Sequence, residues 1–162
     1  MRNLKTKFFL SLLTAVVFGL GLSFNANVQA QKSKAVINHG AAMQQPLYAE
    51  YKGVRLGMSA EEVRAKLGTP AIKDSDQDYY VFSENETAQI VYDASQKVVT
   101  ISVDYQDGIG APDYKAVVGE ELERTANGSL YRMVRYEGLQ LWVSYNRTAS
   151  PVVTVTLTIQ KF

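Results

Sequence analysis

Two stretches decide the fold: Val98–Tyr105, with the sequence VVTISVDY, and Val152–Gln160, with the sequence VVTVTLTIQ. Apolar and polar residues alternate along both stretches, which is the period of a β-strand with one buried face. The two stretches align without gaps at an offset of 54 residues, which places Val99 on Val153, Ile101 on Val155 and Val103 on Leu157. The chain therefore contains the same predicted strand twice.

The first of these strands ends a unit that starts with a well-marked helix. Ser59 and Glu62 have the spacing of a capping box, and a glycine follows the last helical residue. The helix is predicted over Ala60–Leu67, and the strands over Tyr79–Ser83, Ala88–Asp93 and Val98–Tyr105. The connections between these strands are short and polar, which predicts an antiparallel meander.

A second unit repeats this order of elements. A short helix is predicted from Pro112 to Val118, followed by strands over Leu130–Tyr136, Leu139–Tyr145 and Val152–Gln160. In the earlier part of the unit the offset is 51 residues, so that Tyr80 aligns with Tyr131. We therefore expect an α+β fold in which two tandem α-β-β-β repeats, at about 53–105 and about 108–160, form an antiparallel sheet with helices packed on one face.

The composition narrows the class of protein. The chain has 162 residues, one His, no Cys and a formal charge of +1. The absence of Cys excludes disulfides, thiol catalysis and a lipid-modified N-terminal Cys, and a single His excludes a multi-His metal site. The near-neutral charge gives no electrostatic argument for binding nucleic acid. We expect a single domain over residues 51–162 that uses no cofactor.

Residues 1–30 have the layout of a secretory signal peptide. Three basic residues precede an uncharged, mostly apolar run at 8–22, and Val28-Gln29-Ala30 is typical of a cleavage site. The apolar run is shorter than the roughly 20 residues that a membrane-spanning helix needs. We therefore expect a periplasmic or secreted protein with no stable membrane span after cleavage.

Residues 31–50 are predicted to be a flexible linker. They are rich in Gln, Ala, Lys and Asn and show no sustained apolar period. The only histidine, His39, lies in this segment. A catalytic imidazole needs a fixed position beside its partner, so we expect no catalytic role for His39.

The strand alternation also assigns the two faces of the sheet. Val99, Ile101 and Val103 are predicted to share the core face, and large aromatics lie among Thr, Ser and Gln on the other face. Aromatic and Arg side chains in a neutral surround are enriched at the centres of protein interfaces. The candidate partner-binding residues are Trp142, Tyr136, Arg132, Tyr79 and Gln140. Cross-strand packing explains the same aromatics, and this alternative stays open.

One segment begins like a calcium-binding loop. Asp74, Asp76 and Asp78 have the D-x-D-x-D spacing of its first ligands. The sixth position is Tyr79, where that loop has Gly, and the twelfth is Asn85, where it has Glu. A calcium site is thus an alternative to the simpler interpretation, a solvated acidic loop with no metal.

The first repeat resembles the BamE-like (SmpA/OmlA) proteins. The residues that carry the resemblance are Gly57-Met58-Ser59-Ala60-Glu61-Glu62-Val63, Leu67-Gly68-Thr69-Pro70, Tyr80-Val81-Phe82 and Ile90-Val91-Tyr92-Asp93, followed by Lys97-Val98. They are similar to that family's "GMT-x-E-x-V…LG-x-P" opening and to its later strands, over roughly residues 53–105. A tandem pair of such units resembles the β-lactamase-inhibitor-protein-like fold, in which a sheet docks on a partner protein.

The resemblance implies envelope assembly or protein binding without catalysis. BamE proteins are lipoproteins with one repeat, whereas this chain has no Cys and two predicted repeats. We therefore expect an exported, non-enzymatic module that binds a protein partner in the cell envelope or outside the cell. The alternative is a periplasmic protein that binds a small molecule or a lipid.

Overall fold

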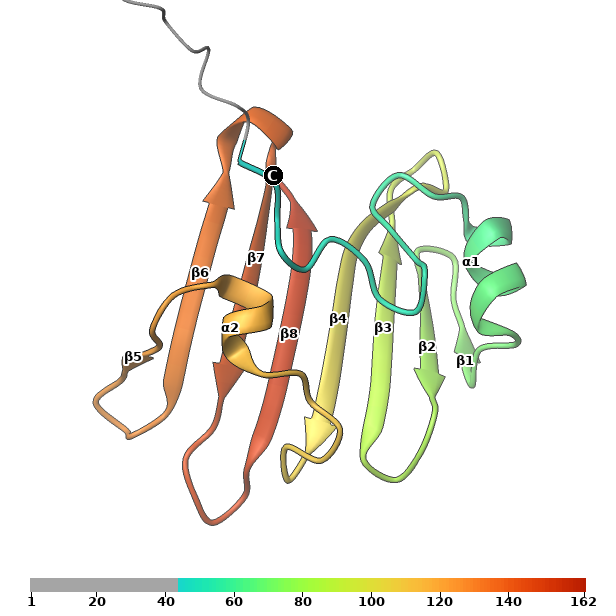
Figure 1. Ribbon diagram of the computed structural model, residues 1–162. Coiled ribbons are helices and arrows are strands. Elements are labelled where there is room, and N and C mark those ends of the chain that lie inside the picture. The colour runs from blue at the N-terminus through green and yellow to red at the C-terminus, as the bar shows by residue number, and fades with distance from the viewer. Residues whose placement is uncertain (1–43) are drawn as a thin grey trace, which may run out of the picture. The chain divides into compact units, whose positions relative to one another are not determined.

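The computed structural model describes residues 44–162, all of which belong to one compact unit. The predicted signal peptide, most of the predicted linker and His39 lie outside these residues. Among residues 44–162, no helix is long and apolar enough to cross a membrane. The described part of the chain contains two α-helices, one 3-10 helix and eight strands (Figure 1). The elements are α1 (Ala60–Leu67), β1 (Ile72–Lys73), β2 (Gln77–Val81), β3 (Glu86–Tyr92), β4 (Val98–Gln106), α2 (Tyr114–Val118), β5 (Glu123–Arg124), β6 (Leu130–Tyr136), η1 (Glu137–Leu139), β7 (Leu141–Arg147) and β8 (Thr154–Lys161).

The eight strands form one antiparallel sheet in the order β1-β2-β3-β4-β8-β7-β6-β5. Each half of the sheet is a meander, and the last strands of the two meanders, β4 and β8, pair at the centre. Their register runs from Thr100↔Gln160 to Gln106↔Thr154. The helix, the short strand and the three longer strands occur in the same order in both halves.

The expectation of an α+β fold with helices packed on one face of the sheet is wrong. The structure is mostly an eight-stranded antiparallel sheet with only 13% helix and one helix of seven or more residues. Helix α1 buries only Ala60 and Val63, and the five-residue α2 buries only Val117 and Val118. Elements of this length cannot form a layer over eight strands.

An irregular segment contributes to the core where the sequence predicted helices alone. Residues 44–58 cross the sheet between α2 and α1 (Figure 1). Tyr51 and Val54 of this segment are buried, and Tyr48 and Leu56 pack against the core. Periodicity could not reveal this role, because an irregular segment has no regular apolar spacing. Tyr48 also belongs to the part of the predicted linker that the structure describes.

Local signals were most accurate at the first helix. Helix α1 has the predicted bounds, and Ser59 and Glu62 form the predicted capping box. Helix α2 begins two residues later than predicted, because the side chain of Asp113, rather than Pro112, defines its start by accepting a hydrogen bond from the N–H of Lys115. The core-facing positions of β4 are Val98, Ile101, Val103 and Tyr105. The prediction of Val99 on this face is wrong, because a β-bulge shifts the register there.

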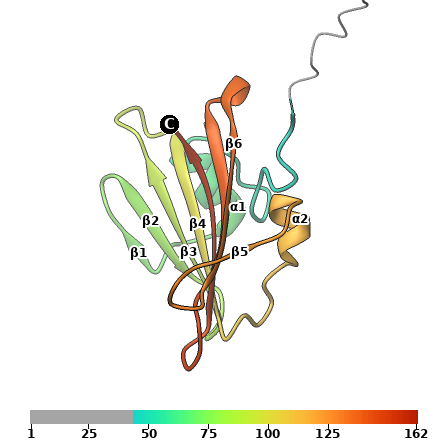
Figure 2. The ribbon, with the colours of Figure 1, turned by 90° about the vertical axis from the view of Figure 1, so that its left-hand side faces the viewer.

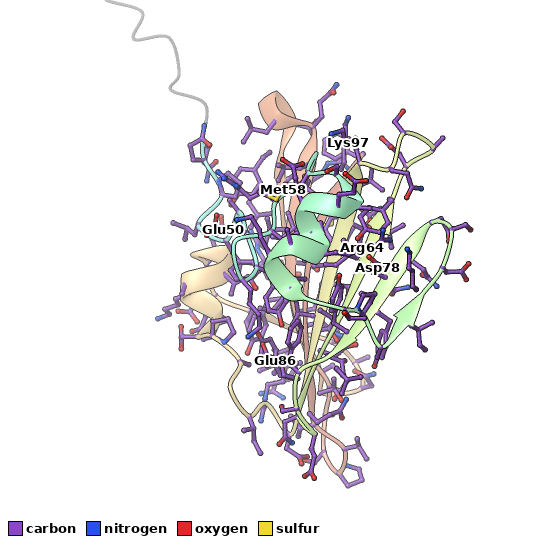
Figure 3. All side chains as sticks on the ribbon, turned by 90° about the vertical axis from the view of Figure 1, so that its right-hand side faces the viewer. Glu50, Met58, Arg64, Asp78, Glu86 and Lys97 are labelled. Atoms are coloured by element: carbon purple, nitrogen blue, oxygen red, sulfur yellow. The ribbon has the colours of Figure 1, made fainter. Side chains whose placement is uncertain are left out.

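A buried carboxylate links α1 to the first half of the sheet. Asp78 on β2 is fully buried and accepts two hydrogen bonds from Arg64 of α1, at 2.8 and 3.0 Å (Figure 3). The hydroxyl of Tyr92 donates a third hydrogen bond to Asp78, at 2.8 Å. Burial raises the pKa of the Tyr80 phenol beside this carboxylate to about 12, so this phenol stays protonated to a higher pH than a free tyrosine does. Asp78 on β2 thereby satisfies donors from α1 and β3.

Replacement of this carboxylate tests its structural role. Asp78→Ala should lower the free energy of unfolding by about 2–4 kcal/mol, because it leaves Arg64 and Tyr92 without their acceptor at a buried position. Asp76→Ala is the matched control, because Asp76 is exposed on the same hairpin and its loss should cost less than about 0.5 kcal/mol. Urea unfolding of both variants measures the difference. Equal stabilities would contradict the role assigned to Asp78.

Candidate functional site

The structure divides the candidate partner-binding residues between the two faces of the sheet. We call the face opposite the hydrophobic core the outer face. Trp142 and Tyr79 lie on it, in different halves of the sheet. Tyr136 and Arg132 lie on the core face, so their predicted position beside Trp142 is wrong. Gln140 belongs to neither face, because it follows η1 in a left-handed turn.

The pairing of β6 with β7 determines which residues of β6 face the core. Val134 pairs with the fully buried Val143, so Val134 and its alternate neighbours, Arg132 and Tyr136, face the core. The sequence of β6, LYRMVRY, has an Arg, an aromatic and an aliphatic residue in each alternate set. Alternation alone could not choose between the two sets, and the alignment of Tyr131 with the buried Tyr80 indicated the wrong one.

Tyr136 and Arg132 have structural partners on the core face. Tyr136 is 5% exposed, and burial raises the pKa of its phenol. The guanidinium of Arg132 forms ion pairs with Glu120 and Glu123, which precede or begin β5. The hydrogen bond to Glu123 is the main cause that raises the pKa of Arg132. Tyr136 is therefore buried in the core, and Arg132 is already ion-paired within the domain.

Trp142 lies in an open groove on the outer face, over β6, β7 and β8. The groove has a volume of about 820 Å³. Trp142 is the only tryptophan of the chain and is partly buried. The residues that line the groove are Thr125, Ala126, Asn127, Ser129, Tyr131, Trp142, Ser144, Asn146, Thr148, Thr156 and Thr158. We call this site the Trp142 groove.

Two loops with internal hydrogen bonds wall the groove. In the β5–β6 loop, the hydroxyl of Thr125 and the N–H of Ser129 both donate to the side-chain oxygen of Asn127. In the β7–β8 loop, the hydroxyl of Thr148 donates to the carbonyl of Val152 at 2.8 Å and accepts from the N–H of Thr154 at 2.7 Å. These contacts fix the walls of the groove without a bound partner, which lowers the entropy cost of binding.

The lining of the groove has no charged side chain. Three charged residues lie on neighbouring outer-face positions, and each has a partner. Glu123, which pairs across the strands with Tyr131, forms an ion pair with Arg132. Arg135, which pairs across the strands with Trp142, lies 3.0 Å from Glu137 and stacks on the ring of Phe162 at 4.2 Å. Asp104 accepts a hydrogen bond from Thr156 at 2.6 Å. The groove therefore offers aromatic rings, hydroxyls and amides in a neutral surround.

Sequence reasoning missed Tyr131 and Met133, which flank the groove on β6. They are 38% and 37% exposed on the outer face, where Tyr131 pairs with Asn146 and Met133 with Ser144. They form the alternate set to the one that was predicted. The sequence signal that could have found them is Arg132, because its acidic partners Glu120 and Glu123 lie shortly before it. Placing Arg132 with these partners on the core face puts Tyr131 and Met133 on the outer face.

The calcium alternative does not fit the structure. The carboxylate of Asp78 is fully buried against Arg64 and Tyr92, and it points away from solvent. Asp74 accepts a hydrogen bond from the N–H of Ser75 in the exposed turn. Within residues 44–162, no group of three His, Cys, Asp or Glu side chains is arranged to hold a metal ion.

Comparison of the chain with protein-family models, with curated protein sequences and with solved structures gives no match in any of the three. The interpretation of the groove therefore depends on its own chemistry.

Two aromatic substitutions test the assignment of Tyr136 to the core face and of Trp142 to the outer face. Tyr136→Ala should lower the free energy of unfolding by about 3 kcal/mol, because it opens a cavity in the core. Trp142→Ala should cost about 1 kcal/mol, because its ring is only partly buried on the outer face. Denaturant unfolding checks both values. A larger loss for Trp142→Ala than for Tyr136→Ala would make Trp142 a core residue.

Proposed function

We propose that the protein is an exported, non-enzymatic module that binds a partner protein through the Trp142 groove. The observation that carries this proposal is the concentration of Trp142, Tyr131 and Met133 on one part of the outer face. Trp, Tyr and Met are enriched at the centres of protein interfaces, and charged residues are depleted there. The uncharged lining of the groove has both properties.

The shape of the groove favours a protein over a small molecule or a lipid. Small-molecule sites bury most of the ligand in an enclosed and mostly apolar cavity. The Trp142 groove is open, so a small molecule in it would stay largely in contact with water. Hydroxyl and amide groups also line the groove, and an acyl chain would offer no hydrogen bond to those without a partner in the domain, which is costly. The groups of a polar partner surface or ordered waters would satisfy them.

The same lining supports a function without catalysis. Ser129 and Ser144 are the serine hydroxyls of the groove, and the lining contains no His, Asp, Glu or Lys to act as their general base. A hydroxyl needs such an adjacent base to become a nucleophile. The groove is thus suited to recognition rather than to reaction.

We further propose a periplasmic or secreted location and a partner in the cell envelope or outside the cell. The predicted signal peptide supports the location. The resemblance of residues 53–105 to BamE-like proteins, and of the repeated element order to the β-lactamase-inhibitor-protein-like fold, supports a role in protein binding.

The experiment starts by capturing a partner from the envelope and secreted fractions of the source with the purified protein as bait. The captured partner is then purified and titrated by calorimetry against the wild-type protein and three variants. Trp142→Ala and Tyr131→Ala should each weaken binding at least tenfold, because both rings line the groove. Tyr79→Ala is the matched control, because Tyr79 is an outer-face aromatic in the other half of the sheet.

The control should bind as the wild-type protein does, and all three variants should remain folded. A partner that binds Trp142→Ala as tightly as the wild-type protein would contradict the proposal. Native mass spectrometry of the purified protein tests the alternative function. If the wild-type protein retains a small molecule that the Trp142→Ala variant does not, the alternative function, binding of a small molecule, would replace the proposed one.

A further inference from the structure

The edge strand β6 is paired along only part of its outer edge. Strand β5 pairs with Leu130 and Tyr131 and then ends (Figure 2). Residues 132–136 of β6 continue beyond it and pair on their other side with β7. Among the described residues, their main-chain groups form no hydrogen bond outside this ladder. Within residues 44–162, five residues of β6 thus have an unpaired edge.

The hydrogen-bond pattern shows which main-chain groups point away from the sheet. The N–H of Thr125 donates to the carbonyl of Ser129 at 2.8 Å, so this pair is a hydrogen-bonded one. Hydrogen-bonded pairs alternate along antiparallel strands, so Tyr131 directs its N–H and C=O towards β5. Two and four residues further on, Met133 and Arg135 direct theirs to the same side, where none of the strands described for residues 44–162 lies.

This edge lacks several of the features that protect a free edge from another strand. Such edges are commonly blocked by proline, a bulge, charged side chains, above all lysine, an inward-pointing charge, or a covering helix or loop. Residues 132–136, RMVRY, contain neither Pro nor Lys, and their pairing with β7 is regular. The two arginines are already paired, Arg132 with Glu120 and Glu123, and Arg135 with Glu137.

We propose that an extended segment of the partner protein adds to the sheet as a strand beside residues 132–136, in line with β5. This inference rests on the proposed function, because it specifies how the partner meets the same half of the sheet. The main-chain groups of Met133 and Arg135 would provide two donors and two acceptors. Side chains of the added strand would then alternate between the core side and the outer face.

The position of this edge relative to the groove fits one continuous partner surface. The side chains of Met133 and Arg135 lie on the outer face, where they pair with Ser144 and Trp142. A residue of the added strand opposite Met133 would extend the row that runs through Ser144 into the groove. The strand would supply affinity through its main chain, and the groove would supply specificity through side chains.

A second copy of the chain fits this edge less well. Symmetric pairing of two β6 strands about Val134 would place Glu137 of the second copy opposite Tyr131. The main chain of Tyr131 already pairs with Glu123 of β5, so η1 of the copy, which begins at Glu137, would lie against β5. A short segment of a different protein has no such restriction.

The opposite edge of the sheet provides a matched control. Strand β1 pairs with Asp78 and Tyr79 of β2, and the N–H of Asp74 donates to the carbonyl of Gln77 at 2.8 Å. By the same alternation, Val81 directs its main-chain groups to the free side of β2 beyond β1. This edge offers one outward residue, whereas β6 offers two.

The test uses peptides selected from a displayed library of random 12-residue sequences with the purified protein as target. Amide hydrogen exchange, followed by NMR with and without a selected peptide, reports on each main-chain N–H. The amides of Met133 and Arg135 should exchange rapidly in the free protein and slow at least tenfold with the peptide bound. Met133→Pro should weaken the peptide at least tenfold, because proline has no N–H to donate.

The control Val81→Pro should bind the peptide as the wild-type protein does. If Met133→Pro fails to fold, the exchange of the wild-type amides alone decides the question. Selected peptides that change the fluorescence of Trp142 but leave both amides exchanging would overturn strand addition and leave the groove as the binding site. If these amides exchange more slowly at higher protein concentration without any peptide, the added strand would belong to a second copy of the chain rather than to a partner. A selection that yields no peptide protecting these amides would also overturn the proposal.

Discussion

The pairing of β4 with β8 is the constraint on which the rest of the structure depends. Each half of the sheet is a four-stranded meander with its own short helix, and the seven-residue register between Thr100–Gln106 and Thr154–Gln160 joins the halves. We call this β4–β8 pairing the seam. Four side chains along it are at most 1% exposed: Ile101, Val103, Leu157 and Ile159. A four-stranded half would expose one apolar edge of the core, and the seam buries that edge in both halves at once.

The seam also makes the outer face continuous while its halves differ in chemistry. Residues of both halves meet across it, as in the hydrogen bond from Thr156 to Asp104. The first half has its buried carboxylate, Asp78, on the core face of the sheet. The second half has the Trp142 groove and an incompletely paired edge strand. The two halves with the same order of elements thus form the scaffold, and the second half carries the candidate site.

The sequence predicted those features that short-range signals determine. The capping box of α1, the alternation of β8 and the alternation of β4 from Ile101 onwards each have one clear solution. The face of β6 could not be predicted, because both alternate sets of LYRMVRY are compatible with burial until Val134 is paired with Val143. The core role of residues 44–58 and the burial of Asp78 depend on tertiary partners, Arg64 among them, that no local pattern contains. The residues of the outer face were therefore half predicted, with Trp142 and Tyr79 on that face and Tyr136 and Arg132 on the core face instead.

Native-state hydrogen exchange at the seam tests this account most directly. The N–H of Asp107 donates to the carbonyl of Val153, so the alternation directs the main-chain groups of Ile101, Val103 and Leu157 across the seam. Their amides should be among the slowest of the protein, with an opening free energy equal to that of global unfolding. Amides that open at the seam with a smaller free energy than those between β3 and β4, or between β7 and β8, would show two separable halves and contradict the account.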